Sequence, residues 1–202
     1  MKQKLVSIFI LACITLTIAI SAQSQDNFSL RSAKANIQGT SSLHDWESEI
    51  TNIQCKGFFH VKNGVLKDVR SAEIKILVEG IKSTKGKMMD RKTYEAFKSD
   101  QHPYITFTFS SGQIAVDSEN IATVEATGNL AMAGTTKAIS LSAKMNVMAN
   151  GDLQLSASKK IKMSDYKMEK PTAMLGTITV GDEVTLNFVL VLTPLTAQAK
   201  KI

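Results

Sequence analysis

The sequence predicts an all-β domain, an antiparallel up-and-down barrel of about eight strands with one short helix. Three observations lead to this prediction. Long segments alternate apolar and polar residues with a period of two, as strands with one buried face do. Tight-turn pairs such as Asn63-Gly64 and Asn150-Gly151 join successive segments, which favours antiparallel pairing. Only one segment beyond residue 24 has the periodicity of an amphipathic helix. A two-sheet sandwich is the main alternative.

Residues 1–24 have the pattern of a secretory signal peptide. Two lysines precede an apolar run from Leu5 to Ile20, and an Ala-x-Ser cleavage pattern follows at Ala22 to Ser24. The run is 16 residues long, short of the ~20 that a membrane-spanning helix needs. The sequence therefore predicts cleavage and a periplasmic or secreted protein. An uncleaved membrane anchor and a lipid-modified Cys13 in a loose lipobox are the alternatives.

The predicted domain covers residues 25–194 and begins with three strands. The first lies around Phe28 to Ile37, where the alternation slips once near Ser32 and indicates a β-bulge. The second is expected to run unbroken from Trp46 to Val61. After the Asn63-Gly64 turn comes a third strand, whose inward positions are Ala72, Ile74, Ile76 and Val78.

The segment Met88 to Lys98 is predicted to be the helix. Ser83 or Thr84 is expected to cap its start, and His102-Pro103 lies just past its end. Its apolar face consists of Met89, Thr93, Ala96 and Phe97. Two interpretations stay open: a lid that adapts its shape through its methionines, or a plug that simply fills the barrel end.

The hairpin from Ile121 to Asn150 has the strictest alternation, with residues 131–136 expected to form its connection. Small residues stand among large ones on its inward face, so this face either meets bulky groups or encloses a space. The second arm has 11 residues from Ile139 to Ala149, which at ~3.3 Å each span roughly 36 Å. The inward residues are Val124, Ala126, Gly128, Leu130, Ile139, Leu141, Ala143, Met145, Val147 and Ala149.

Three more strands complete the predicted barrel. One precedes the central hairpin at Tyr104 to Ser110, and the others follow it at Leu153 to Met163 and Val184 to Leu192. A loop over residues 164–176 connects the last two. Residues 195–202 are expected to form a C-terminal tail.

The amounts of charge and of aromatic residues exclude several classes of protein. The net charge is +6 over 202 residues and falls to +4 when residues 1–24 are removed. Apart from one cluster, basic residues do not run beyond pairs, which disfavours nucleic-acid binding and permits a mild preference for anionic surfaces. One Trp and three Tyr are too few for the aromatic girdles of a membrane barrel. The basic cluster consists of Lys85, Lys87, Arg91 and Lys92.

The predicted domain keeps a single cysteine, Cys55, which cannot form an internal disulfide. It occupies an alternating position and is expected to be a small buried hydrophobic residue. The three histidines are too scattered for a readable metal site. We therefore expect no metal and no cofactor.

Four stretches together resemble the YceI-like family of periplasmic lipid-binding barrels. They are Gly39 to Trp46, the segment from Lys87 through His102-Pro103 to Phe107, the turn region Gly128 to Lys137, and Ser164-Asp165-Tyr166 with Gly181 to Val184. Their order and spacing cover nearly all of residues 25–194. The chain departs from the family at Met89-Asp90, where a basic run more often follows the methionine.

The resemblance implies an extended lipocalin-like, eight-stranded antiparallel barrel. It also implies that a long-chain isoprenoid or similar amphiphilic lipid binds in an apolar tunnel, for carriage or storage in the periplasm, with no catalytic residues. The mixed sizes of the inward residues favour a tunnel independently, since eight strands leave room for one small ligand. The predicted ligand-binding residues are Trp46, Met88, Phe97, Phe107, Phe109, Ala126, Gly128, Ala143, Met145 and Phe188.

Two other classes of function stay open. A stress-response or interaction protein would have a filled barrel core and no lipid ligand. An enzyme would have a polar cluster inside the barrel, although no Ser-His-Asp spacing stands out. As partners we expect a lipid and no nucleic acid, and the sequence is compatible with transient membrane contact and with a homodimer. His44, Asp45 and Trp46 either touch a head group or anchor a loop across the barrel end.

Overall fold

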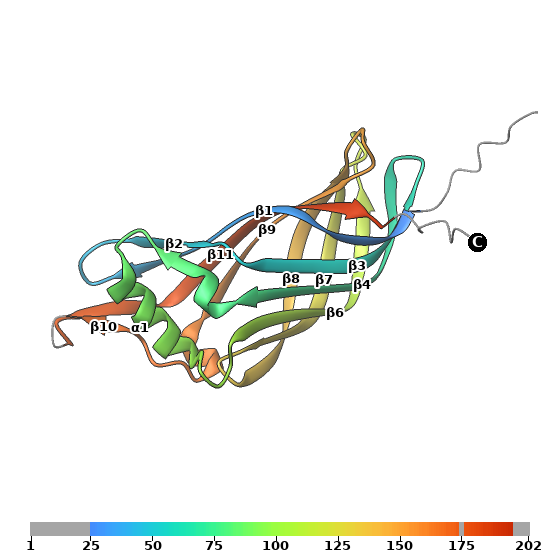
Figure 1. The fold of residues 1–202 in the computed structure, drawn as a ribbon. Coiled ribbons are helices and arrows are strands. Elements are labelled where there is room, and N and C mark those ends of the chain that lie inside the picture. Colours follow the sequence, from blue (N-terminus) through green and yellow to red (C-terminus); the bar gives the residue numbers. More distant parts are fainter. Residues whose placement is uncertain (1–24, 174–175, 196–202) are drawn as a thin grey trace, which may run out of the picture.

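The computed structural model describes residues 25–173 and 176–195, which form a closed eight-stranded antiparallel barrel with one helix (Figure 1). The predicted signal peptide and residues 196–202 of the predicted tail lie outside the described residues. Within the described ranges, no helix has the length and apolarity needed to cross a bilayer. The predicted fold class is confirmed.

Hydrogen-bonded neighbours around the barrel follow the order β11-β9-β8-β7-β6-β4-β3-β1, and pairing of β1 with β11 closes the ring. The helix α1 (Lys87–Phe97) and the short strands β2 (Trp46–Ile50) and β10 (Thr172–Ala173) gather at one end (Figure 1). The described chain ends lie at the other. The remaining elements are β1 (Gln25–Ser41), β3 (Ile53–Lys62), β4 (Val65–Leu77), η1 (Val78–Gly80, a 3₁₀ turn), β5 (Ile81–Ser83), β6 (Tyr104–Val116), β7 (Ala122–Met132), β8 (Thr135–Val147), β9 (Leu153–Lys162), η2 (Met163–Tyr166, a 3₁₀ turn) and β11 (Ile178–Pro194).

The central hairpin is formed by β7 and β8, and its predicted inward residues are mostly buried. Its connection is shorter than the predicted 131–136. The two residues Ala133 and Gly134 make the turn, with φ angles of 48° and 78°. Positive φ at both central positions is the geometry whose twist matches that of antiparallel strands. The predicted bulge in the first strand is also present, as a register shift between Leu30 and Ser32.

The prediction of one strand from Trp46 to Val61 is wrong, because the chain breaks at Thr51 and Asn52 into β2 and β3. The Thr51 backbone N–H donates to the carbonyl of Gly80, and the Leu77 N–H donates to the carbonyl of Asn52, at 2.9 and 3.1 Å. These bonds from a distant segment bend the chain. β2 then pairs with the second half of β1 and with β5, and β3 pairs with the first half of β1 and with β4.

The helix is confirmed and starts one residue earlier than predicted, but its predicted cap is wrong. Gly86 precedes the first helical residue, and no side chain caps the start. Instead Asp90, inside the helix, accepts a 2.7 Å hydrogen bond from the backbone N–H of Ser83. The Tyr94 hydroxyl donates to the carbonyl of Glu79 at 2.9 Å and accepts from Lys82 Nζ at 2.6 Å. One side of α1 is therefore fastened to η1 and β5, and another side faces the barrel interior.

The barrel core has two parts. The part far from α1 is filled by its own side chains, including Phe28 and Phe59, whose rings meet edge to face at 5.8 Å between centroids. Cys55 belongs to this filled end. Its thiol is buried, and burial together with the nearby charge of Glu73 raises its pKa to about 12, so it is unreactive near neutral pH. The other part of the core surrounds the cavity described below.

A buried carboxylate anchors the turn between β8 and β9. Asp152 accepts hydrogen bonds from Arg31 at 2.5 Å and from the Asn150 amide at 2.9 Å, and only 4% of its side chain is exposed. Burial by itself would raise the pKa of Asp152. The hydrogen bonds from Arg31, Thr193 and Asn150 outweigh that effect, and its pKa lies below the usual value.

The strands β8 and β9 pair over only part of their length. Their ladder runs from Val147 and Leu153 to Ala143 and Ala157, and residues 135–142 and 158–162 do not pair with each other. Near the α1 end an ion pair of 3.1 Å between Lys137 on β8 and Asp165 on η2 bridges the opening. This unpaired stretch, here called the β8–β9 seam, interrupts the otherwise hydrogen-bonded wall.

Candidate ligand-binding site

A cavity of ≈ 290 Å³ lies beneath α1, between the helix and the interior faces of the barrel strands. The predicted apolar face of the helix forms one side of it, with Met89, Thr93, Ala96 and Phe97 all in the lining. The opposite side consists mainly of apolar residues from several strands and from the loop after β9. These are Ile37, Met132, Ile161, Met163, Met168, Pro171, Ile178, Val180 and Val184.

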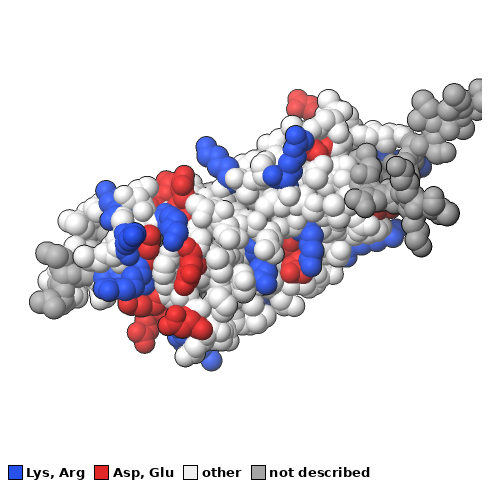
Figure 2. All heavy atoms as spheres, in the orientation of Figure 1, with Lys and Arg blue, Asp and Glu red and all other residues white. Residues whose placement is uncertain are grey.

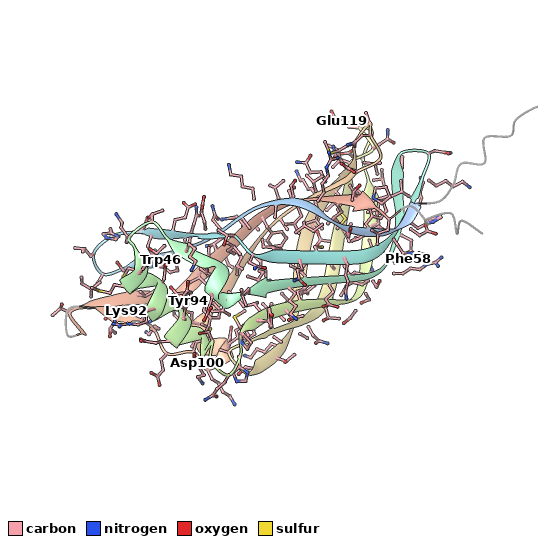
Figure 3. All side chains as sticks on the ribbon, viewed as in Figure 1. Trp46, Phe58, Lys92, Tyr94, Asp100 and Glu119 are labelled. Atoms are coloured by element: carbon pink, nitrogen blue, oxygen red, sulfur yellow. The ribbon has the colours of Figure 1, made fainter. Side chains whose placement is uncertain are left out.

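Trp46 lies in the wall of this cavity near the β1–β2 turn. It pairs in register with Gly39, and a Cβ atom at Gly39 would meet the Trp46 ring at 2.5 Å, so glycine is required for the indole to lie flat there. The indole N–H donates to the carbonyl of Thr40 at 3.0 Å. His44 Nδ1 lies 2.7 Å from the carbonyl oxygen of Asp45. Trp46, Lys92 and Tyr94 all lie at the α1 end of the molecule (Figure 3).

The mouth of the cavity carries the polar part of the lining. Ser41, His44, Ser83, Lys85 and Lys92 are half-buried or exposed and mark this mouth. The charged groups of the lining are thus cations at the mouth, and the buried lining is apolar apart from Ser48. In residues 25–173 and 176–195, no three His, Cys, Asp or Glu side chains come together as a group that could hold a metal ion.

A second cavity of ≈ 50 Å³ continues the first along the barrel interior. On β11 the lining passes from Val184 to Leu186 and Phe188, and on β9 from Ile161 to Lys159. Residues two apart on a strand share a face, so the two cavities lie one after the other along the same walls. Lys159 is the charged residue in this inner lining and lies on the β8–β9 seam, where β8 leaves β9 uncovered.

The space above Gly128 is filled rather than open. A Cβ atom at Gly128 would meet the Phe107 ring at 2.5 Å, so this ring covers the glycine. Phe107 and Phe188 line the inner cavity, and half-buried Phe109 packs beside both parts of the core. The interior is therefore a hollow half that ends near these phenylalanines, and not the continuous tunnel expected from the sequence.

The structure brings together four of the predicted ligand-binding residues around the two cavities: Trp46 and Phe97 in the outer one, and Phe107 and Phe188 in the inner one. It places Met88 on the outside of α1, 68% exposed. Three others pack in the filled end: Ala126, Ala143 and Met145. Phe59 and Leu66 belong to the same cluster and are almost fully buried, so bulky groups occupy the room beside these small residues.

Sequence reasoning missed the lining contributed by Met132, Ile161, Val180 and the methionines after β9. Ile161 and Met163 lie in the predicted strand Leu153 to Met163, but the sequence does not show that this end of the strand lies next to the helix. Their position along the strands could have identified them, because inward-facing residues nearest the barrel end that the helix covers are expected to line a cavity beneath it. Tyr166, in the same region, is buried, and among the described residues its hydroxyl is the buried side-chain polar atom that has no hydrogen-bond partner.

Comparison with known proteins identifies the family. The model of the YceI-like domain matches residues 20–192. The chain belongs to the YceI-like family. The uncharacterized protein RP016 of Rickettsia prowazekii is 27% identical over 117 residues, which is 57% of this chain and 39% of that protein. This YceI-like chain thus matches well under half of that relative's length.

Two solved structures share the YceI-like fold of this chain. BcnA of Burkholderia cenocepacia is 20% identical, with a TM-score of 0.63, over 80% of this chain and 96% of BcnA. A polyisoprenoid binding domain from Saccharophagus degradans, implicated in plant cell wall breakdown, is 15% identical with a TM-score of 0.63, over 83% of this chain and 98% of that domain. At these identities the likeness concerns the fold.

Proposed function

We propose that this protein binds a long-chain isoprenoid or a similar amphiphilic lipid in the cavity beneath α1, and carries or stores it in the periplasm. The observation that carries the proposal is the largely apolar cavity of ≈ 290 Å³, whose lining lysines, Lys85 and Lys92, are exposed or half-buried. An apolar chain gains about 0.8 kcal/mol for each CH₂ group it buries. The polar end of an amphiphile would then stay at the mouth.

The cavity also argues against the alternative of a filled-core interaction protein, since that function predicts a barrel without a hollow. The polyisoprenoid binding domain of Saccharophagus degradans, which shares the fold, supports the proposed class of ligand. The absence of an enzymatic activity and the formation of a homodimer stay predictions. The periplasmic location is supported by the pattern of residues 1–24.

The volume limits how a long chain is held. Pockets that bury drug-sized ligands measure ~300–1,000 Å³, so ≈ 290 Å³ suits part of a long chain. The next part would occupy the inner cavity beside Phe188, or would open the β8–β9 seam. Affinity should therefore rise by roughly fourfold per CH₂ group for short chains, and level off once the chain reaches the phenylalanines.

Native mass spectrometry of protein purified without detergent tests the proposal. We expect a bound lipid, or uptake of a lipid on incubation, and a protein that neither carries nor takes up lipid would end the proposal. The blocking variant is Ala96→Phe, because Ala96 lines the cavity and a phenyl ring there would occupy it. The matched control is Ala115→Phe, at an exposed position near the end of β6, which should retain lipid. Equal lipid content in the two variants would place the ligand elsewhere.

A further inference from the structure

We propose that the mouth of the cavity docks directly onto an anionic lipid bilayer. Leu43 and Met88 insert among the lipids, and the mouth lysines, defined as Lys85, Lys87 and Lys92, contact the anionic head groups. This surface adjoins the cavity that holds the ligand and shares Leu43, Lys85 and Lys92 with its lining.

The apolar part of the surface is unusual in its exposure and its place. Leu43 is 66% exposed and Met88 68%, the highest values among the large apolar side chains of the described residues. They come from different segments, the β1–β2 turn and the first turn of α1. Leu43 lines the cavity, and Met88, on the outside of α1, is next in sequence to Met89, which lines it. A single exposed apolar residue is ordinary, but here the two most exposed ones belong to the two segments that flank the cavity.

The mouth lysines have no carboxylate partner in the described part of the chain. The acids of α1 are already engaged: Asp90 accepts the Ser83 N–H and is buried, and Glu95 pairs with Arg91 at 3.5 Å. Asp45 is the exposed acid of the neighbouring turn. Figure 2 shows Lys and Arg at the α1 end with several acidic side chains among and beside them, and Figure 3 places Lys92 at that end.

These features fit a bilayer better than a protein partner. Protein interfaces need roughly 1,000 Å² with an apolar centre from which lysine is depleted. Here two apolar side chains stand among lysines, which is the composition of surfaces that lie in the head-group region of anionic membranes. Docking in this orientation would also let a lipid pass between bilayer and cavity without crossing water.

Sedimentation with vesicles tests the docking surface. The vesicles contain phosphatidylcholine alone, or phosphatidylcholine with phosphatidylglycerol. The test variant is Lys87→Gln with Met88→Ser, because neither residue lines the cavity. The matched control is Lys67→Gln with Met148→Ser, which makes the same changes at exposed positions at the far end of the barrel. The test and control variants have the same N-terminal sequence, so a difference in vesicle binding between them comes from the substituted residues. Leu43→Ser gives a second, independent test.

We expect the unaltered protein to bind the anionic vesicles, to bind neutral vesicles much more weakly, and to be released by high salt. The test variant should bind about tenfold more weakly, Leu43→Ser should also weaken binding, and the control should bind as the unaltered protein does. Equal binding of the test and control variants, or equal binding to both kinds of vesicle, would overturn the proposal. So would self-association without vesicles that the test variant abolishes, since a second copy would then cover this surface. Loss of docking with lipid still bound leaves the proposed function standing.

Discussion

Replacing Phe59 by Ala should destabilise the barrel strongly while leaving its cavity intact. Phe59 is fully buried in the filled end and packs edge to face on Phe28. Truncating such a phenylalanine costs about 3–5 kcal/mol. At about 2–4 °C per kcal/mol for a domain of this size, the melting temperature should fall by roughly 6–20 °C.

The assay combines thermal unfolding with lipid retention. Phe59→Leu is the milder variant, for use if the alanine variant does not fold, and it should show the same direction with a smaller fall. Phe97→Ala is the contrasting variant, because Phe97 lines the cavity; it should alter lipid retention. A fall below ~3 °C for Phe59→Ala, or loss of lipid from the folded Phe59 variants, would refute the division into a filled end and a hollow end.

Three further predictions concern buried polar groups. With Cys13 replaced by Ser, the buried Cys55 thiol, whose pKa burial raises to about 12, should react with a thiol reagent at pH 8 only after unfolding, and rapid labelling of the native protein would contradict this. Tyr166→Phe should stabilise the fold by ~1–3 kcal/mol in urea unfolding, because it removes a buried hydroxyl without a partner; a loss of stability would reveal a partner. The carboxylate of Asp152 has a lowered pKa in the fold, so its stabilisation is present above the ordinary carboxyl pKa of ~3.9 and is lost as the pH falls through the folded value. Unfolding followed from pH 6 down to 3 should therefore show a smaller loss for Asp152→Asn than for the unaltered protein, and parallel curves would contradict this.

The sequence was sufficient for the strand number, the helix and most inward-facing positions, because these follow from local periodicity. It did not reveal the break at Thr51, because that bend depends on hydrogen bonds to Gly80, nearly thirty positions away. Nor did it reveal that the room beside Ala126 and Ala143 is filled. Alternation shows that a small residue faces inward, but which bulky side chain comes from the opposite wall is decided by the closed topology.

The same reasoning explains why part of the candidate site was predicted and part was missed. The helix face with Met89 and Phe97 could be read from its spacing, and both residues line the cavity. Val180 and Ile178 precede the stretch that was predicted as the last strand. The long β11 brings Val180 into register with Ser41 of β1 and pairs Ile178 with Ala173 of β10, and both residues line the cavity.

The filled end bears on the stability of the fold when a ligand leaves the cavity. Phe28, Leu153 and Leu190 are at most 1% exposed and pack with other side chains of the same chain. A barrel whose core was completed only by its ligand would tend to unfold whenever it became empty. Here the chain's own side chains complete the core of the filled end, so we expect the folded protein to persist after releasing the proposed lipid and to bind another.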